Sequence, residues 1–364
     1  MRQANNLAIP EEYSDRLSSL RFPLIVGVVF IHAYGFSVLY SNKAIGINSF
    51  SNYLIFFQNL ISQGVGRIAV PMFFLLSGYF FFINFKFSTR SFFNKLSSRC
   101  KTLLVPFLFW NITTLVALWA VQAFPVTLSF FPDKSLVIRT YETYDYFKAI
   151  FGIDRFPIAY QFWFVRDLMM LVVLVPVLNL LLKVIPTFSL CLVGGAWFFS
   201  VWSLEPPSIT ALSFFYLGAY LAHFNKNLFS LDKYGNIILI GYIAILFFDT
   251  YFITSPYHPY LHRAGLLLGI ISAFYLTSYL VFHHKAKSLL LYASVPSFFV
   301  FAIHEPLLTV VKKISYIVFE PTTEVVVLAL YLAIPLSVVG FSLLIYYACL
   351  FLFPQFLRVV SGGR

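Results

Sequence analysis

The chain has 364 residues, of which 60% are hydrophobic and only 11% are charged, with a mean hydropathy of +0.84. Soluble domains are about half apolar and about a quarter charged, so this composition excludes an ordinary soluble protein and predicts an all-α polytopic membrane protein. Aromatic residues make up 20% of the chain, which fits lipid-facing helices with rings at the membrane surface. The formal net charge of +11 does not indicate a nucleic-acid partner, because its distribution follows the membrane helices.

The N-terminal segment and the cysteines exclude further classes. Residues 1–19 are polar and lack the short apolar run and small-residue cleavage site of a signal peptide, so we expect no cleaved signal peptide. The basic residues described below predict that this N-terminal segment is cytoplasmic. Cys100, Cys191 and Cys349 show neither a CxxC pattern nor metal-ligand spacing, so we expect no disulfide framework and no metal. No repeat or separate soluble domain is visible, and one membrane domain is expected over residues 1–364.

About ten apolar stretches are candidates to cross a bilayer. The fifth ends at the helix-breaking Glu205-Pro206-Pro207 and the sixth is short, so a merged re-entrant pair is the alternative for these two. The stretches are residues 20–40, 62–84, 102–124, 161–183, 187–204, 209–224, 235–254, 262–283, 288–311 and 325–352.

The basic residues predict the orientation of these helices. With a cytoplasmic N-terminus, 15 of the 25 Lys and Arg residues lie on the inner side and 8 on the outer side. This bias favours both termini inside, and the basic loop 84–101, which has no acid, contributes most to it. The longest outer connection, residues 125–160, holds four acids and is rich in tyrosine, which suits sugar contacts and a headgroup-level belt equally.

The first span carries Arg21 at its start and His32 deep inside. An ionisable side chain within hydrocarbon is costly and is therefore a functional candidate. Eleven residues turn a helix by about 1100°, so the two residues share a face and lie about 16 Å apart along the axis. A neutral imidazole there can act as a general base. The alternatives are a positive-inside signal for Arg21 and a helix-packing hydrogen bond for His32.

The second span contains Pro71, Ser77 and Gly78, which predict a closely packed or broken helix. Two interpretations stay open: helix packing through Ser77-Gly78, or a local opening that shapes an acceptor or acyl channel. Arg67 would lie near the outer end of this span.

Two further clusters of charge flank the spans. Arg99 and Lys101 close the inner basic loop and would hold phosphates of a nucleotide headgroup, although binding of anionic lipid or a purely topological role is the alternative. Trp163, Arg166 and Asp167 open the fourth span. Arg166 and Asp167 either pair with each other or bind sugar hydroxyls, while Trp163 stacks on the sugar ring.

The ninth span contains His304 and Glu305, followed by the helix-interrupting Pro306. Adjacent helical residues point about 100° apart, so each of these groups needs another partner. Because titratable side chains are costly within a membrane, a functional site is favoured over a purely structural role for these two residues. Five other histidines lie at span ends, where interfacial or solvated roles are expected: His223, His258, His262, His283 and His284.

Taken in order, these stretches resemble the acyltransferase family 3 of integral membrane acyltransferases, and the resemblance covers most of the chain. Arg21 and His32 look like the family's basic residue and histidine separated by ten residues. The family's FF-x-x-SG element is similar to residues 73–78. Its WF-type helix start resembles Trp163 to Leu168, and its late histidine resembles His304. The family's R-x-x-R loop is only partly matched, because Thr102 stands at the second basic position.

The resemblance implies transfer of an acyl group, usually acetyl, from cytoplasmic acetyl-CoA to a hydroxyl of a cell-surface glycan or lipid-linked sugar. It implies a multi-pass protein of the bacterial cytoplasmic (inner) membrane that uses acyl-CoA as a co-substrate, with no bound cofactor. The expected catalytic residues are His32, as base or acyl carrier, and Arg21. The expected acyl-CoA contacts are Arg21, Arg99 and Lys101, and the acceptor or channel residues are Arg67, Ser77, Trp163, Arg166, Asp167, His304 and Glu305.

Two functions from other classes remain as alternatives. A glycan transporter or flippase would use the same polar residues without making a bond. An intramembrane serine protease using Ser77 and His304 is disfavoured, because Leu75 stands where the G-x-S-G pattern requires glycine. The acceptor, the acyl group and the oligomeric state are left open by the sequence.

Overall fold

The computed structural model describes residues 11–40, 43–47, 50–124, 127, 137–202 and 205–363. Residues 1–10 of the predicted N-terminal segment lie outside the described residues, as do 125–126 and 128–136 of the predicted outer connection. The described part is almost entirely helical, which confirms the all-α prediction apart from one short β-hairpin.

Six helical stretches within the described residues are long and apolar enough to cross a membrane. They are Glu11–Ala33, Asn52–Phe82, Thr89–Val121, Asp232–Tyr251, His258–Leu280 and Glu324–Leu352. Two bent pairs raise the number to eight if each pair is one span: Tyr160–Val173 with Val175–Val184, and His284–Ser294 with Ser297–Phe319. The chain is therefore a multi-pass membrane protein, whereas a total of ten spans and the side of the termini stay predictions.

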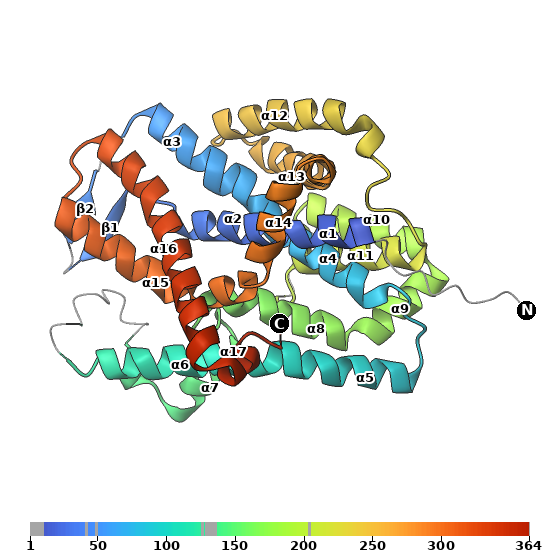
Figure 1. Cartoon of the computed structure of the whole chain (residues 1–364), viewed down its shortest axis with the longest axis horizontal. Coiled ribbons are helices and arrows are strands. Elements are labelled where there is room, and N and C mark those ends of the chain that lie inside the picture. Colours follow the sequence, from blue (N-terminus) through green and yellow to red (C-terminus); the bar gives the residue numbers. More distant parts are fainter. Residues whose placement is uncertain are drawn as a thin grey trace, which may run out of the picture. The chain divides into compact units, whose positions relative to one another are not determined.

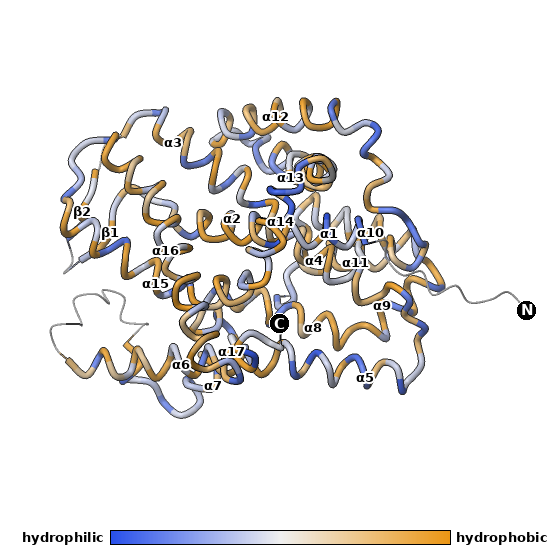
Figure 2. Tube along the Cα trace, viewed as in Figure 1, coloured by the Kyte–Doolittle hydropathy of each residue, from blue (hydrophilic) through white to orange (hydrophobic). Residues whose placement is uncertain are grey.

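The two weakest predicted spans coincide with shorter apolar helices, α10 (Pro186–Phe198) and α11 (Ile209–His223). Hydrophobic residues cover most of α12 (Gly235–Tyr251) and α16 (Glu324–Leu352), whereas α5 (Thr89–Arg99), from the basic loop 84–101, is largely polar (Figure 2).

The chain forms two compact units that interleave in sequence. The first contains Met1–Gly27, Gly64–Ser98 and Asp167–Ser297, and the second contains Val28–Gln63, Arg99–Arg166 and Phe298–Arg364. The boundary between them falls within α2 (Arg21–Ala33), between Gly27 and Val28.

The first unit is built mainly from α-helices. They are α1 (Glu11–Ser19), the start of α2, α4 (Ala69–Phe82), α5, most of α8 (Trp163–Val173), α9 (Val175–Val184), α10, α11, α12, α13 (His258–Leu276) and α14 (His284–Ser294). Short 3₁₀ turns precede α4 (Gly66–Ile68) and α12 (Asp232–Tyr234), and another follows α13 (Thr277–Val281).

Helices α4 and α11 pack with their backbones in direct contact. A Cβ added to Gly78 would collide with the Phe215 carbonyl, and one added to Gly218 would collide with the Leu75 carbonyl. Small residues allow this close approach between membrane helices. The packing interpretation of the Ser77-Gly78 motif therefore has direct structural support at Gly78.

The second unit holds the end of α2, a β-hairpin and the C-terminal helices. Its further elements are β1 (Ser37–Tyr40), β2 (Lys43–Gly46), α3 (Asn52–Gln58), most of a π-helical stretch (Asn59–Val65), a second such stretch (Cys100–Leu104), α6 (Val105–Val121), a 3₁₀ turn (Ile138–Thr140), α7 (Thr143–Phe151), a 3₁₀ turn (Tyr160–Phe162), the start of α8, α15 (Ser297–Phe319), α16 and α17 (Pro354–Val360). Buried hydroxyls connect these elements, since Ser62 donates to the Phe30 carbonyl at 2.5 Å and shares a 2.7 Å hydrogen bond with Tyr331.

The predicted first span, residues 20–40, was wrong at its C-terminal end. The helix ends at Ala33, and Ser37–Tyr40 pairs in antiparallel register with Lys43–Gly46. Gly35 lies at φ 118°, a conformation that non-glycine residues rarely adopt and that ends the helix. The hydrophobicity of residues 20–40 alone could not indicate that the helix stops at Ala33.

Candidate active site

His32 lies one residue before the end of α2, and the side chain of Lys312 fixes this end. The Lys312 ammonium donates hydrogen bonds to the carbonyls of Ala33 and Tyr34, both at 2.9 Å, and of Gly35 at 3.4 Å. These carbonyls have no partner within the helix, and a cation at a helix C-terminus is favourable. Lys312 therefore holds the backbone that positions the His32 imidazole.

Tyr160 joins His32 to Glu305. Its hydroxyl lies 2.9 Å from His32 Nδ1 and donates to Glu305 Oε1 at 3.1 Å. A phenol has a single proton, so a hydroxyl that donates to the carboxylate accepts from Nδ1–H of the imidazole. This arrangement assigns the proton of neutral His32 to Nδ1 and the lone pair to Nε2. A lone pair on Nε2 suits a general base, with Nδ1 oriented by a second group as in a catalytic triad.

The position of Tyr160 is set by its neighbours in sequence. The buried Asn111 of α6 accepts from the Ala159 amide at 3.0 Å and donates to the Phe107 carbonyl at 2.8 Å. Tyr160 then begins the 3₁₀ turn that leads into α8. A buried amide with both ends engaged fixes this backbone, so the Tyr160 hydroxyl is held before any ligand arrives.

Glu305 lies where α15 is interrupted, as the sequence predicted. Its backbone (φ −113°, ψ 134°) is extended, because the residue before a proline is pushed out of the helical region. The Gln161 amide group donates to the carbonyls of Ala302 and Glu305, both at 3.0 Å, and so satisfies backbone groups at the break. The second carboxylate oxygen of Glu305 accepts from Thr309 at 2.8 Å.

His304 is fully buried beside His32, with ring centroids 5.4 Å apart. Its Nδ1 donates to the Phe301 carbonyl at 2.7 Å, which places the lone pair on Nε2. That Nε2 is buried and makes no hydrogen bond within the described residues. The neighbouring residues His304 and Glu305 thus have separate partners, as expected, and both belong to the neighbourhood of His32.

Other predicted site residues of the second unit have the following environments. Arg166 donates to the carbonyls of Gly152, at 2.7 Å, and Arg155, at 3.3 Å, so it stabilises the turn after α7. Trp163 begins α8, immediately after the turn that carries Tyr160. Arg99 ends α5 and is half-buried, and Lys101 is exposed in the adjoining π-helical stretch.

The remaining predicted residues belong to the first unit. Arg21 is the exposed first residue of α2, so Arg21 and His32 do lie on one continuous helix. Arg67 is exposed in the turn before α4, and Ser77 is half-buried within α4. Asp167 is fully buried and accepts from the Ser208 amide at 2.8 Å, which fixes the start of α11.

Five residues around His32 and Glu305 were not predicted from the sequence: Tyr160, Gln161, Asn111, Thr309 and Lys312. In the sequence, Lys312 is one of the eight basic residues of the predicted outer side, and Tyr160 is one tyrosine of the predicted outer connection 125–160. A usable signal was the four-residue spacing from Glu305 to Thr309, which places a hydroxyl one turn after an acid. The long-range partners, such as Asn111 for Ala159, have no local signal in the sequence.

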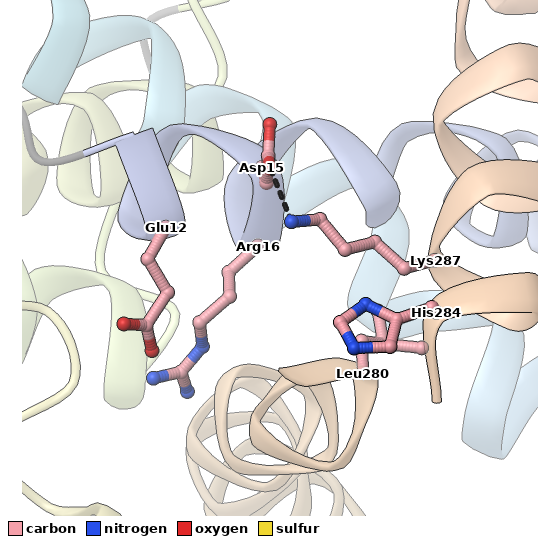
Figure 3. A pocket seen from close by; sticks show the side chains of 6 residues that line it. All are labelled: Glu12, Asp15, Arg16, Leu280, His284 and Lys287. Atoms are coloured by element: carbon pink, nitrogen blue, oxygen red, sulfur yellow. Dashed lines mark ion pairs between the residues drawn. The ribbon is translucent and has the colours of Figure 1, made fainter. Parts of the chain in front are cut away.

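A small pocket in the first unit contains none of these residues (Figure 3). It is lined by Glu12, Asp15, Arg16, Leu280, His284 and Lys287. Lys287 pairs with Asp15 at 2.6 Å, and the buried Arg16 pairs with Asp232 at 2.7 Å. Since both cations are engaged by carboxylates, the pocket has no excess positive charge for a polyanion.

Comparison with known proteins identifies the class. The acyltransferase domain family matches residues 15–353, so the chain belongs to this family and is a multi-pass membrane acyltransferase. Among curated proteins it is similar to the succinoglycan biosynthesis protein ExoH of Rhizobium meliloti (strain 1021). The two are 26% identical over 305 residues, which cover 81% of this chain and 78% of that protein. No solved structure matches the chain.

Proposed function

We propose that this protein transfers an acyl group, in the first instance acetyl, from acyl-CoA to a hydroxyl of a cell-surface glycan or lipid-linked sugar. The observation that carries the proposal is the Tyr160 hydroxyl placed between His32 Nδ1 and Glu305. Membership of the acyltransferase domain family supports the reaction class. The name of its relative, a succinoglycan biosynthesis protein, supports a polysaccharide or its precursor as the acceptor.

In the proposed reaction His32 Nε2 removes the proton from the acceptor hydroxyl. The hydroxyl oxygen attacks the thioester carbonyl, the carbon–sulfur bond breaks, and the proton on His32 passes to the departing thiolate. The products are an ester and free CoA. The imidazolium formed during attack is stabilised through Tyr160 and Glu305, because a hydrogen-bonded carboxylate favours the charged ring. His304 contributes a second imidazole lone pair, which is able to accept from the acceptor hydroxyl.

The donor is proposed to enter from the cytoplasmic side of a bacterial inner membrane. Arg21, Arg99 and Lys101 are suited to CoA phosphates, because guanidinium and ammonium groups form charge-assisted hydrogen bonds with them. The length of α2 from Arg21 to His32, about 16 Å, allows a thin thioester arm to reach the imidazole. Trp163 is the proposed sugar contact, and Arg166 and Asp167 are the proposed acceptor residues beside it in sequence, although Arg166 also holds the turn after α7 and Asp167 the start of α11. Arg67 and Ser77 are kept as candidate channel residues.

The test uses the purified full chain in detergent, labelled acetyl-CoA and a lipid-linked sugar fraction. We expect thiol release and labelled acceptor, and we expect His32→Ala to lower both by about 10²- to 10⁴-fold, the usual contribution of a general base. A folded His32→Ala protein with full transfer would refute the proposal. Absence of thiol release from the intact protein would instead favour the transporter alternative.

A second measurement separates the two roles that are open for His32. Acid quenching after mixing with labelled acetyl-CoA alone traps any acyl-enzyme. Label on the intact protein that disappears in His32→Ala identifies an acyl carrier. Turnover without trapped label identifies a general base.

A further inference from the structure

Three metal-ligating side chains meet between α12 and α13, which lie side by side in the first unit (Figure 1). Asp249 near the end of α12 faces His258 and His262 at the start of α13. Asp249 Oδ1 lies 3.3 Å from His258 Nε2, and Oδ2 lies 2.9 Å from His262 Nδ1. The proposed acyl-transfer mechanism uses none of these residues.

The geometry of the three donors suits a small divalent ion. His258 and His262 are four residues apart on one helix, so their rings share a face and stack with centroids 5.6 Å apart. One donor atom from each of the three residues can be chosen so that all lie within 4.8 Å of one another. A tetrahedral zinc ion with bonds of about 2.0–2.2 Å separates its ligand atoms by about 3.3 Å. The two Asp–His separations, 3.3 and 2.9 Å, are already near that spacing, whereas a pair of donors as far apart as 4.8 Å would have to close by about 1.5 Å.

Asp249 itself supplies an independent observation. Only 5% of this residue is exposed, and its buried Oδ1 receives no hydrogen bond from the part of the chain that the structure describes, despite the nearby His258 Nε2. A buried carboxylate oxygen without a donor is costly, and a bound cation removes that cost. Each carboxylate oxygen of Asp249 has a histidine ion pair, but the 3.3 Å contact of Oδ1 with His258 is not a hydrogen bond, so Oδ1 has no hydrogen-bond donor among the described residues.

We propose that Asp249, His258 and His262 bind one divalent transition-metal ion of the zinc class. Two imidazoles and one carboxylate form a borderline donor set that suits zinc and disfavours calcium and magnesium, which prefer oxygen ligands. The three protein ligands leave a fourth position for water. The ion joins the end of α12 to the start of α13 across the connection 252–257, so it stabilises this helical hairpin.

This inference revises the expectation that the chain has no metal. That expectation rested on the spacing of the cysteines, and the two histidines were assigned to interfacial roles. The informative pattern was instead His-x-x-x-His nine residues after a buried aspartate. Its meaning depends on the turn between the two helices, which brings Asp249 back onto His258.

The test measures zinc binding to the intact, tag-free chain in detergent after treatment with a chelator. We expect about one zinc per chain by elemental analysis, and a higher unfolding temperature when zinc is returned. We expect Asp249→Asn to weaken binding by at least about 100-fold, because loss of mere outer-shell partners already costs 10–100-fold. The asparagine retains an oxygen that can accept from His262, so a purely structural hydrogen bond would survive.

His223→Ala serves as the matched control, because His223 ends α11 and is not a member of the cluster. This variant should bind zinc as the intact chain does. Cobalt titration gives a second readout: a visible tetrahedral spectrum in the intact protein and in His223→Ala, absent in His262→Ala. Failure of the intact chain to bind zinc at micromolar concentration would overturn the proposal. Equal zinc affinity of the intact chain and Asp249→Asn would overturn it as well.

Discussion

The Lys312 ammonium donates a 2.9 Å hydrogen bond to the carbonyl of Ala33, the residue that follows His32 and ends α2. A charge on α15 thus determines where the helix carrying the proposed base stops. The same ammonium interacts electrostatically with Glu305, seven residues before it on α15. Lys312 is therefore a positioning residue for His32 and for Glu305, the two groups that the Tyr160 hydroxyl connects.

Replacing Lys312 with methionine tests this role. We expect kcat for acyl transfer to fall by about 10- to 100-fold, because a displacement of about 1 Å at a reacting group has costs of this size. KM for acyl-CoA should change little, which separates positioning from donor binding. Lys313→Met is the matched control and should retain activity, since it leaves the contacts of Lys312 intact. A large rise in KM with unchanged kcat would contradict the assignment.

Tyr160→Phe removes the hydroxyl and keeps the ring. We expect kcat to fall by about 10- to 100-fold, because His32 loses the group that orients its Nδ1 proton. The unfolding temperature should stay near that of the intact chain. Tyr146→Phe, which deletes a hydroxyl that donates to the Ile138 carbonyl at 3.0 Å, is the structural comparison and should keep its activity. Equal rates for both variants would remove Tyr160 from the mechanism.

Glu305→Gln keeps the size of the side chain and removes its charge. We expect kcat to fall by about 10²-fold or more, since the imidazolium loses the carboxylate that stabilises it through Tyr160. Glu324→Gln changes an acid that accepts from the Ser51 amide and hydroxyl, both at 2.5 Å, and should leave transfer unaffected. Single-turnover kinetics with labelled acetyl-CoA provide the measurement. A normal single-turnover rate in Glu305→Gln would exclude a role for its charge.

Gly78→Ala tests the contact between α4 and α11. The added Cβ would meet the Phe215 carbonyl, so we expect a loss of stability of about 1–3 kcal/mol, the usual cost of overpacking. Gly194→Ala is the control, because a Cβ there would have no atom of the described residues within 4 Å. Thermal unfolding in detergent compares the two variants. An unchanged transition for Gly78→Ala would mean that the helices separate at little cost.

The sequence predicted those features that depend on local composition. Apolar length located the six to eight candidate membrane helices of the described residues, although not a confirmed total of ten, and Pro306 located the interruption of α15. The cost of burying titratable groups singled out His32, His304 and Glu305, which the fold brings together around Tyr160.

The remaining features depend on contacts between residues far apart in the chain. The end of α2 at Ala33 depends on Gly35 and on a lysine 279 residues away. Hydropathy cannot report such a contact, because the lysine and the helix end carry no common local pattern. Likewise, the partnership of Asn111 with the Ala159 amide appears only when α6 is placed beside the turn that precedes α8.

The interruption of α15 also restricts the chemistry of residue 161. The Gln161 amide uses its nitrogen to serve two carbonyls, Ala302 and Glu305, on α15. A glutamate there would set oxygen against oxygen, and a leucine would leave both carbonyls without their donor. Position 161 therefore admits a nitrogen donor and little else. The Gln161 side chain therefore holds the backbone of Glu305 beside the residue that follows Tyr160, and it does so without needing to contact either substrate.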